Sequence, residues 1–115
     1  MNELDGGHIR SATRLLKALA NERRLSILCL LGRGEMCVSA LADAVGLGQS
    51  ALSQHLARLR AEGLVRTRRE SQTIFYALAS AEAAAVIEVL AGLYCERPPA
   101  GHSSSNQPFR RETLT

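Results

Sequence analysis

The stretch VSALADAVGLGQSALSQHLARLRAEGLVRTRRESQTIFYAL, residues 38–78, decides the fold of this chain. It opens with two short segments of helical spacing that are joined by a turn containing glycine. Ser39 can cap the first of them, a helix over residues 40–45 that Gly46 ends, and the second begins at Ser50 and is bounded by Gly63. Two short helices joined in this way are typical of a helix-turn-helix.

The second of these helices has an apolar side and a polar side. Leu52, Leu56 and Leu59 follow the three-four spacing of a buried stripe. Short polar donors and an arginine on the opposite side can reach base edges and phosphates in the major groove of DNA. The candidate DNA-binding residues on this helix are Ser50, Ser53, Gln54, His55 at the edge of the polar side, and Arg58.

Residues 64–78 predict a two-stranded hairpin, because alternating and β-branched residues flank the polar turn Glu70-Ser71-Gln72. Most basic residues of this segment lie on its first strand. A basic hairpin beside a recognition helix can contact the neighbouring DNA backbone or enter the minor groove. The candidate DNA-binding residues of the hairpin are Arg66, Arg68, Arg69, Gln72 and Thr73.

Three further helices are predicted around this stretch. The first spans residues 9–19, the second follows the N-cap Asn21 and ends at Gly32, and the last follows the N-cap Ser80 and spans 81–95. The last helix has more apolar surface than one small domain normally covers. The predicted fold is therefore mainly α with a small β-hairpin, in the order helix, helix, helix, helix, hairpin, helix, which is the order of a winged helix-turn-helix.

The length of 115 residues is typical of one domain. We expect a flexible N-terminus over residues 1–7, the folded domain over 8–96 and a flexible C-terminal tail over 97–115, where proline and serine gather. Three cysteines and no apolar signal segment favour a reducing cytoplasm over a secreted disulfide framework. No apolar run approaches the ~18 residues of a membrane span, so no membrane partner is expected.

The basic residues are concentrated in one segment, although the net charge of the chain is small. The net charge is only +3, but five arginines and two glutamates lie between Arg58 and Glu70. All but one of the 14 basic residues are arginine, which suits forked contacts with phosphates and bases. A solvated surface would explain such a cluster taken alone. Together with the order of the elements, the cluster favours DNA binding.

Two segments resemble a known family. LKALANERRLSILCLL, residues 16–31, and the stretch 38–78 look like the ArsR/SmtB family of dimeric bacterial repressors, over about residues 12–95. The resemblance implies a homodimer held by the first and last helices. It also implies a double-stranded operator with twofold symmetry, in which the two recognition helices enter major grooves about 34 to 36 Å apart.

The family resemblance also raises the possibility of a metal signal. Metal-sensing relatives have a Cys-x-Cys pair at the start of the third helix, or carboxylates and histidines on the last helix. Here Cys37 is present, but Ser39 stands in place of the second thiol, and the last helix has no histidine. The alternative function is therefore a metal- or metalloid-responsive repressor in which Cys37 binds together with another cysteine, His8 or His102.

A subgroup that responds to persulfide, sulfide or oxidants resembles the chain more closely. Its two sensing thiols match Cys29 in SILCLL and Cys95 in LYCERPP. The resemblance implies that these thiols join in a disulfide or sulfur-bridged link that releases DNA. Electrostatics alone favours a thiolate at Cys37, before a helix N-terminus, over Cys95 at a helix C-terminus. Without the resemblance, Cys29 would be read as a small core residue.

A thiol enzyme is a third interpretation. A peroxidase or persulfide transferase would need a general base beside its cysteine. His55 falls on the predicted DNA-binding side, and His8 and His102 lie near the ends of the chain. We therefore expect no enzymatic activity and no cofactor.

Overall fold

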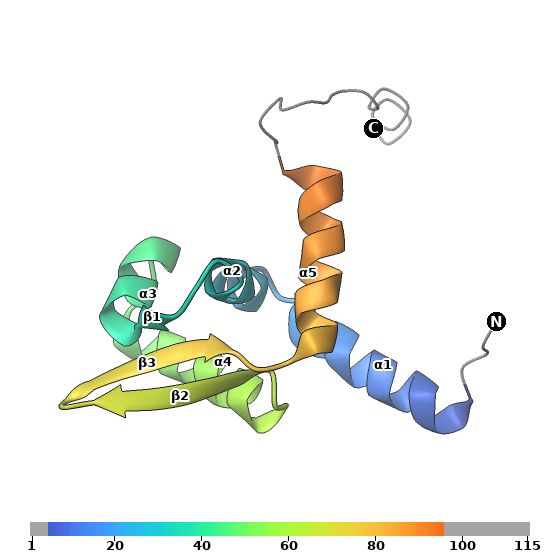
Figure 1. The fold of residues 1–115 in the computed structure, drawn as a ribbon, viewed down its shortest axis with the longest axis horizontal. Coiled ribbons are helices and arrows are strands. Elements are labelled where there is room, and N and C mark those ends of the chain that lie inside the picture. The colour runs from blue at the N-terminus through green and yellow to red at the C-terminus, as the bar shows by residue number, and fades with distance from the viewer. Residues whose placement is uncertain (1–4, 96–115) are drawn as a thin grey trace.

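A computed structural model describes residues 5–95, which form five helices and three strands (Figure 1). The expected tail over 97–115 lies outside the described residues. The elements are, in chain order, α1 (Gly6–Leu19), α2 (Glu22–Leu31), β1 (Met36–Cys37), α3 (Val38–Val45), α4 (Gln49–Ala61), β2 (Val65–Glu70), β3 (Thr73–Leu78) and α5 (Ala81–Tyr94). This order confirms the predicted winged helix-turn-helix.

The sheet has one strand more than the sequence predicted. Its strands are antiparallel in the order β1-β3-β2, and β1 pairs through Met36 with Tyr76 and through Cys37 with Phe75. A strand of two residues has too little periodicity to be recognised from its sequence. The hairpin of β2 and β3, hereafter the wing, closes through a turn of two residues, since Glu70 still pairs with β3.

Of the five predicted helix starts, two are confirmed and three are corrected, including that of α1. The side chains of Asn21 and Ser80 accept the backbone N–H groups of Arg24 and Ala83 and so cap α2 and α5. In α3, however, the N-cap is Cys37, because β1 runs directly into the helix and places Ser39 inside its first turn. The second helix of the motif begins at Gln49, one residue before the predicted start.

The N-terminal boundary also differs from the expectation. Asp5 caps α1 by accepting the backbone N–H of His8 at 2.8 Å. This hydrogen bond lets the helix begin at Gly6, so residues 6 and 7 are helical although they were expected in a flexible N-terminus.

All five helices and the base of the wing contribute buried residues to the core. Its largest fully buried side chains are Ile27, Leu28, Leu41, Leu52 and Leu59. The leucine stripe predicted for α4 is therefore the side that packs inward, and this packing fixes which side of α4 remains outside.

Two arginines of α2 hold neighbouring helices in place. Arg23 Nη1 donates to the carbonyl oxygen of Val45 at 2.8 Å, at the end of α3. Arg24 Nε donates to the carbonyl oxygen of Ala18 at 2.7 Å, in the last turn of α1. The last carbonyl groups of a helix have no partner within it, so these bonds satisfy atoms that would otherwise need water.

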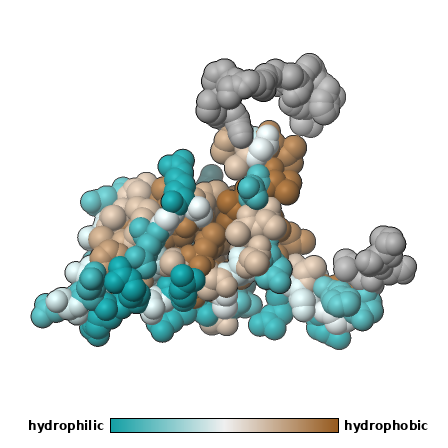
Figure 2. All heavy atoms as spheres, viewed as in Figure 1, coloured by the Kyte–Doolittle hydropathy of each residue, from teal (hydrophilic) through white to brown (hydrophobic). Residues whose placement is uncertain are grey.

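The buried residues of α5, Ala83 and Ile87, lie in its first half, and its second half projects away from the domain (Figure 1). Figure 2 shows hydrophobic residues along this helix, whereas the wing is mostly hydrophilic. Among the described residues, the large apolar side chains that remain exposed all lie on the first and last helices: Ile9, Leu16, Val89, Leu93 and Tyr94. Within residues 5–95, no helix is both long and apolar enough to cross a membrane.

Candidate DNA-binding face and dithiol site

The outer side of α4 carries the polar residues that the sequence analysis named as candidates for DNA binding. Ser50, Ser53, Gln54 and Arg58 are exposed, and His55 is half-buried at the edge. The arrangement follows from the buried leucines on the opposite side of the same helix. Short hydrogen-bonding side chains next to an arginine can contact base edges and phosphates when such a helix enters a major groove.

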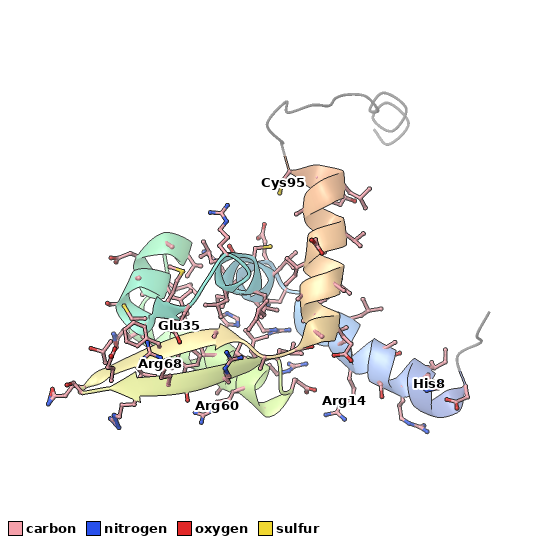
Figure 3. The ribbon with its side chains drawn as sticks, in the orientation of Figure 1. His8, Arg14, Glu35, Arg60, Arg68 and Cys95 are labelled. Carbon is pink, nitrogen blue, oxygen red and sulfur yellow. The ribbon has the colours of Figure 1, made fainter. Side chains whose placement is uncertain are left out.

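Arg60 is a basic residue of α4 that the candidate set omitted. It is exposed, and with Ser53 and Tyr76 it lines a hollow of about 400 Å³ between α4 and the wing. Figure 3 shows its side chain on the outside of the domain. The sequence did place Arg60 in the arginine cluster, and that could have marked it as a DNA-binding candidate. Helical spacing alone did not show whether its side chain faces outward or inward. Arg60 joins the candidate DNA-binding residues.

The wing presents different residues on its two faces, because side chains alternate along a strand. Val65 and Arg69 share one face, and Val65 is buried in the core beside α4. Arg66 and Arg68 point to the other face. Arg69 therefore lies on the same face of the wing as the recognition helix, although all three arginines are exposed.

The three wing arginines also differ in their partners. Arg66 Nη1 donates to the carbonyl oxygen of Leu78 at 2.8 Å. Arg68 pairs with the two carboxylates of Glu35 and Glu70. In the part of the chain that the structure describes, no ion pair is recorded for Arg69. The last two candidates, Gln72 and Thr73, are exposed at the tip.

Cys29 and Cys95 lie on different helices but within electrostatic reach of each other. Both thiols are unbonded and exposed, and Cys29 lies on α2. Figure 3 shows Cys95 at the outer end of α5. Desolvation raises the pKa of Cys29, repulsion from a thiolate at Cys95 raises it further, and Arg33 partly offsets both. Cys29 is exposed on α2 rather than packed in the core, so the interpretation as a core residue is wrong.

Cys37 has the opposite electrostatic environment. Its Sγ lies 3.5 Å from the Ser39 hydroxyl at the start of α3. This hydrogen bond, followed by one from the backbone N–H of Ala40, lowers the pKa of the Cys37 thiol. The structure therefore agrees with the electrostatic expectation for Cys37, and it places this residue at the end of β1, directly before α3.

The structure does not assemble a metal site from the candidate ligands. Within residues 5–95, no group of three or more histidine, cysteine, aspartate or glutamate residues could hold a metal ion. His8 instead lies 3.1 Å from Asp5 through its Nδ1 atom. The other histidine considered, His102, lies outside the described residues.

Comparison with known proteins identifies the family. Residues 21–67 match the family described as "Bacterial regulatory protein, arsR family". The transcriptional activator HlyU of Vibrio cholerae is 59% identical over 85 residues, which cover 74% of this chain and 79% of HlyU. The chain belongs to the ArsR family. The biofilm growth-associated repressor of Xylella fastidiosa is 43% identical over 81 residues, covering 70% of this chain and 71% of the repressor.

Solved ArsR-family structures agree with the fold. Reduced HlyU from Vibrio cholerae superposes with a TM-score of 0.77 at 56% identity, covering 78% of this chain and 95% of that one. A second solved structure is the homodimeric winged helix-turn-helix DNA-binding domain of Mb0332 from Mycobacterium bovis. It superposes with a TM-score of 0.67 at 35% identity, and the match covers 89% of this chain and 97% of that domain. ArsR-family proteins are DNA-binding regulators of transcription, which confirms the prediction of a regulator rather than an enzyme.

Proposed function

We propose that this ArsR-family regulator is a homodimeric repressor that binds a twofold-symmetric operator and releases it when Cys29 and Cys95 become linked. The observation that carries the proposal is that both thiols are unbonded and exposed, with Cys29 on α2 and Cys95 directly after α5. A negative charge on Cys95 also contributes to the raised pKa of Cys29. Two thiols in such an arrangement can be joined only if the helices keep or adopt a defined relative position. The link would therefore change the structure as well as the chemistry.

The dimer in this proposal forms through α1 and α5. Leu93 is 64% exposed and Tyr94 is 78% exposed on α5, and Leu16 is 57% exposed on α1. Apolar patches of this kind mark protein interfaces in soluble domains. The homodimeric relative Mb0332 supports a second copy of the chain as the partner.

The inducer in this proposal is a hydrogen polysulfide or another thiol oxidant. One thiolate attacks a sulfur atom of HSSH, so that a cysteine persulfide forms and hydrosulfide leaves. The second thiolate then attacks the cysteine-bound sulfur of the persulfide, and a second hydrosulfide leaves as the disulfide forms. The two thiols are oxidised by two electrons, and the two sulfur atoms of HSSH are reduced.

DNA release follows from the position of α5 in this proposal. Cys95 lies at the outer end of the dimer helix, and Cys29 lies on α2 next to the helix-turn-helix. A bond between them fixes the direction of α5 relative to α4, and hence the separation of the two recognition helices in the dimer. To change the operator from nearly fully occupied to nearly empty, the link must shift the equilibrium between the DNA-binding and the released conformation by about 5.5 kcal/mol. A covalent link can supply a free energy of this size.

Binding of DNA before and after sodium tetrasulfide treatment tests the proposal. The probe is a labelled duplex that the reduced parent protein selects from a random-sequence pool. We expect polysulfide to release the parent from the duplex, whereas Cys29→Ser and Cys95→Ser proteins bind it and stay bound. Cys37→Ser is the matched control and should be released like the parent.

Mass spectrometry of the treated parent should find Cys29 and Cys95 in one linked peptide pair, directly or through additional sulfur atoms. Release of either the Cys29→Ser or the Cys95→Ser protein as readily as the parent would overturn the sensing mechanism. Failure of the parent to select any duplex would instead overturn the DNA-binding part of the proposal.

A further inference from the structure

Glu35 and Arg68 form an ion pair that spans the three-stranded sheet. The Nε and Nη2 atoms of Arg68 donate to the two carboxylate oxygens of Glu35 at 3.1 and 2.8 Å. Glu35 directly precedes β1 and Arg68 lies on β2, which are the two strands on either side of β3. The pair therefore connects the two edges of the sheet across its central strand (Figure 3).

Arg68 has two further partners on the wing. Its Nη1 atom lies 3.3 Å from Oε1 of Glu70, and its guanidinium carbon lies 4.6 Å from the ring centroid of Phe75 on β3. Each of the three guanidinium nitrogens thus faces a carboxylate, while an aromatic ring covers one face of the group. The hydrogen bond from Arg68 also holds the pKa of Glu35 below its usual range.

The ion pair lies where the wing leaves the domain. In the register of the sheet, Arg68 is opposite Phe75, and Phe75 is opposite Cys37, the last residue of β1. Beyond this point, residues 69–74 pair only with each other. The direction in which the tip of the wing projects is therefore set at the level of Arg68.

The charge around Arg68 does not favour a contact with phosphate. A phosphate that approaches its guanidinium also approaches the carboxylates of Glu35 and Glu70, both of which are partly exposed. Arg69 follows directly on the strand, points to the face beside α4, and has no recorded ion pair among the described residues. The two neighbouring arginines are thus suited to different roles.

We propose that Arg68 is a positioning residue, which together with Glu35 fixes the direction of the wing relative to α4, and that Arg69 makes the phosphate contact. This inference rests on the DNA binding proposed above, and it gives Arg68 a role other than the direct contact expected from the sequence. Glu35, which no sequence pattern indicated, becomes a residue that supports DNA binding despite its negative charge.

A single substitution distinguishes positioning of the wing by Glu35 from the general effect of its negative charge on DNA binding. Glu35→Gln removes a negative charge from a DNA-binding protein, so electrostatics alone would tighten binding and steepen its salt dependence. If Glu35 positions the wing, the same substitution weakens binding to the selected duplex by about three- to tenfold, the range expected for loss of an exposed but bidentate ion pair.

Exchange of the two charges gives the decisive test. Arg68→Glu alone should weaken binding at least about tenfold, because it places a third carboxylate beside Glu35 and Glu70 without a cation. The double variant Glu35→Arg with Arg68→Glu restores the pair in reverse, and should recover binding to within about threefold of the parent. Glu35→Arg with Arg69→Glu is the matched control, because it carries the same added arginine. It lacks the Glu35–Arg68 pair, so it should bind no more tightly than Arg69→Glu alone.

Thermal unfolding of each variant shows whether the domain is intact, and only variants that melt within a few degrees of the parent are compared. The inference is overturned if Glu35→Gln tightens binding or if the charge exchange leaves binding as weak as Arg68→Glu alone. Either result would mean that the Arg68 side chain itself contacts DNA. A parent protein that selects no duplex would instead refute the proposed function, and this inference with it.

Discussion

Cys37 pairs with Phe75 between β1 and β3, and the same Cys37 is the N-cap of α3. The first helix of the helix-turn-helix and β3, the central strand of the sheet, are therefore joined at one residue. Phe75 in turn lies beneath the guanidinium group of Arg68. The wing and the helix-turn-helix are thus connected by backbone pairing and by a side-chain cluster at the same level of the sheet.

The three cysteines consequently have different surroundings. Cys37 belongs to the connection between wing and helix-turn-helix, whereas Cys29 lies on α2 and Cys95 directly follows α5. Reactivity toward an alkylating reagent and a role in sensing are then separate properties, because alkylation follows the thiolate population while sensing needs a partner thiol.

We predict that Cys37 reacts with iodoacetamide at lower pH than Cys29. The hydrogen bond from Ser39 lowers the pKa of Cys37, so its thiolate forms below the usual range of a thiol. Desolvation and the charge of Cys95 raise the pKa of Cys29, so its thiolate forms only above that range. The rate of alkylation at each cysteine, measured by mass spectrometry over a series of pH values, gives both midpoints.

Two variants test the physical causes of the alkylation midpoints of Cys37 and Cys29. Ser39→Ala should move the midpoint of Cys37 upward and leave that of Cys29 in place. Cys95→Ser should move the midpoint of Cys29 downward, since it removes the repulsion between the thiolates. A midpoint of Cys29 that does not respond to Cys95→Ser would contradict the influence of Cys95 on the pKa of Cys29, which is one support of the proposed sensing pair.

The exposed apolar face of α5 leads to a prediction about assembly. Leu93→Glu should convert the dimer to a monomer, because each chain would bury a charge in place of a leucine. Loss of about 1.5 to 3 kcal/mol of apolar burial at each of two symmetric sites raises the dimer dissociation constant at least about a hundredfold. Molar mass measured by light scattering during size-exclusion chromatography reports the change.

Ala84→Glu is the matched control for the dimer. Ala84 is exposed on the same helix, roughly opposite Leu93 around the helix axis, and one turn before Glu88. A carboxylate is already present on this side of α5, so the variant should keep the mass of the parent. A dimer that survives Leu93→Glu would show that α5 does not form the interface.

Local regularities account for what the sequence predicted correctly. The leucines of α4 recur at helical spacing, and this spacing alone assigns Ser53, Gln54 and Arg58 to the outer side of the helix. Gly46 could be recognised as the end of α3 because glycine readily adopts the left-handed conformation found there, with a φ of 69°.

Features that depend on residues distant in the chain were not predictable. Ser39 looked like an N-cap because the two-residue strand β1, which depends on pairing with β3, left no pattern in the sequence. Glu35 and Arg68 meet only when the sheet has formed. Cys29 lies in a run that is apolar on all sides, so spacing could not distinguish an exposed thiol from a buried one.

The turn between α3 and α4 leads to a prediction about stability. Gly46→Ala should lower the free energy of unfolding by about 1 to 2 kcal/mol, since a left-handed backbone conformation is unfavourable for a residue with a Cβ atom. Gly46→Asn should cost less, because asparagine tolerates this conformation better. Urea unfolding followed by circular dichroism measures both values.

The same glycine-to-alanine change in a helix is the control. Gly7 lies in the first turn of α1, where an added Cβ would meet only an ordinary contact at 3.6 Å from Asp5. Gly7→Ala should therefore be neutral or stabilise the domain by up to about 1 kcal/mol. Equal losses at Gly46 and Gly7 would show that the left-handed turn is not the cause.

The last prediction concerns Arg69, the wing arginine on the same face as α4. Arg69→Gln should weaken binding to the selected duplex by about three- to tenfold and reduce the magnitude of the slope of log K against log salt by about 1, as expected when one phosphate contact is lost. Fluorescence anisotropy at several salt concentrations gives both quantities. Arg10→Gln removes the same charge from an exposed position on α1, at the far end of the domain from the wing (Figure 1), and should leave the slope within the error of the parent. An equal change of slope for both variants would mean that only net charge matters, whereas a change for Arg69 alone places this residue against the DNA backbone.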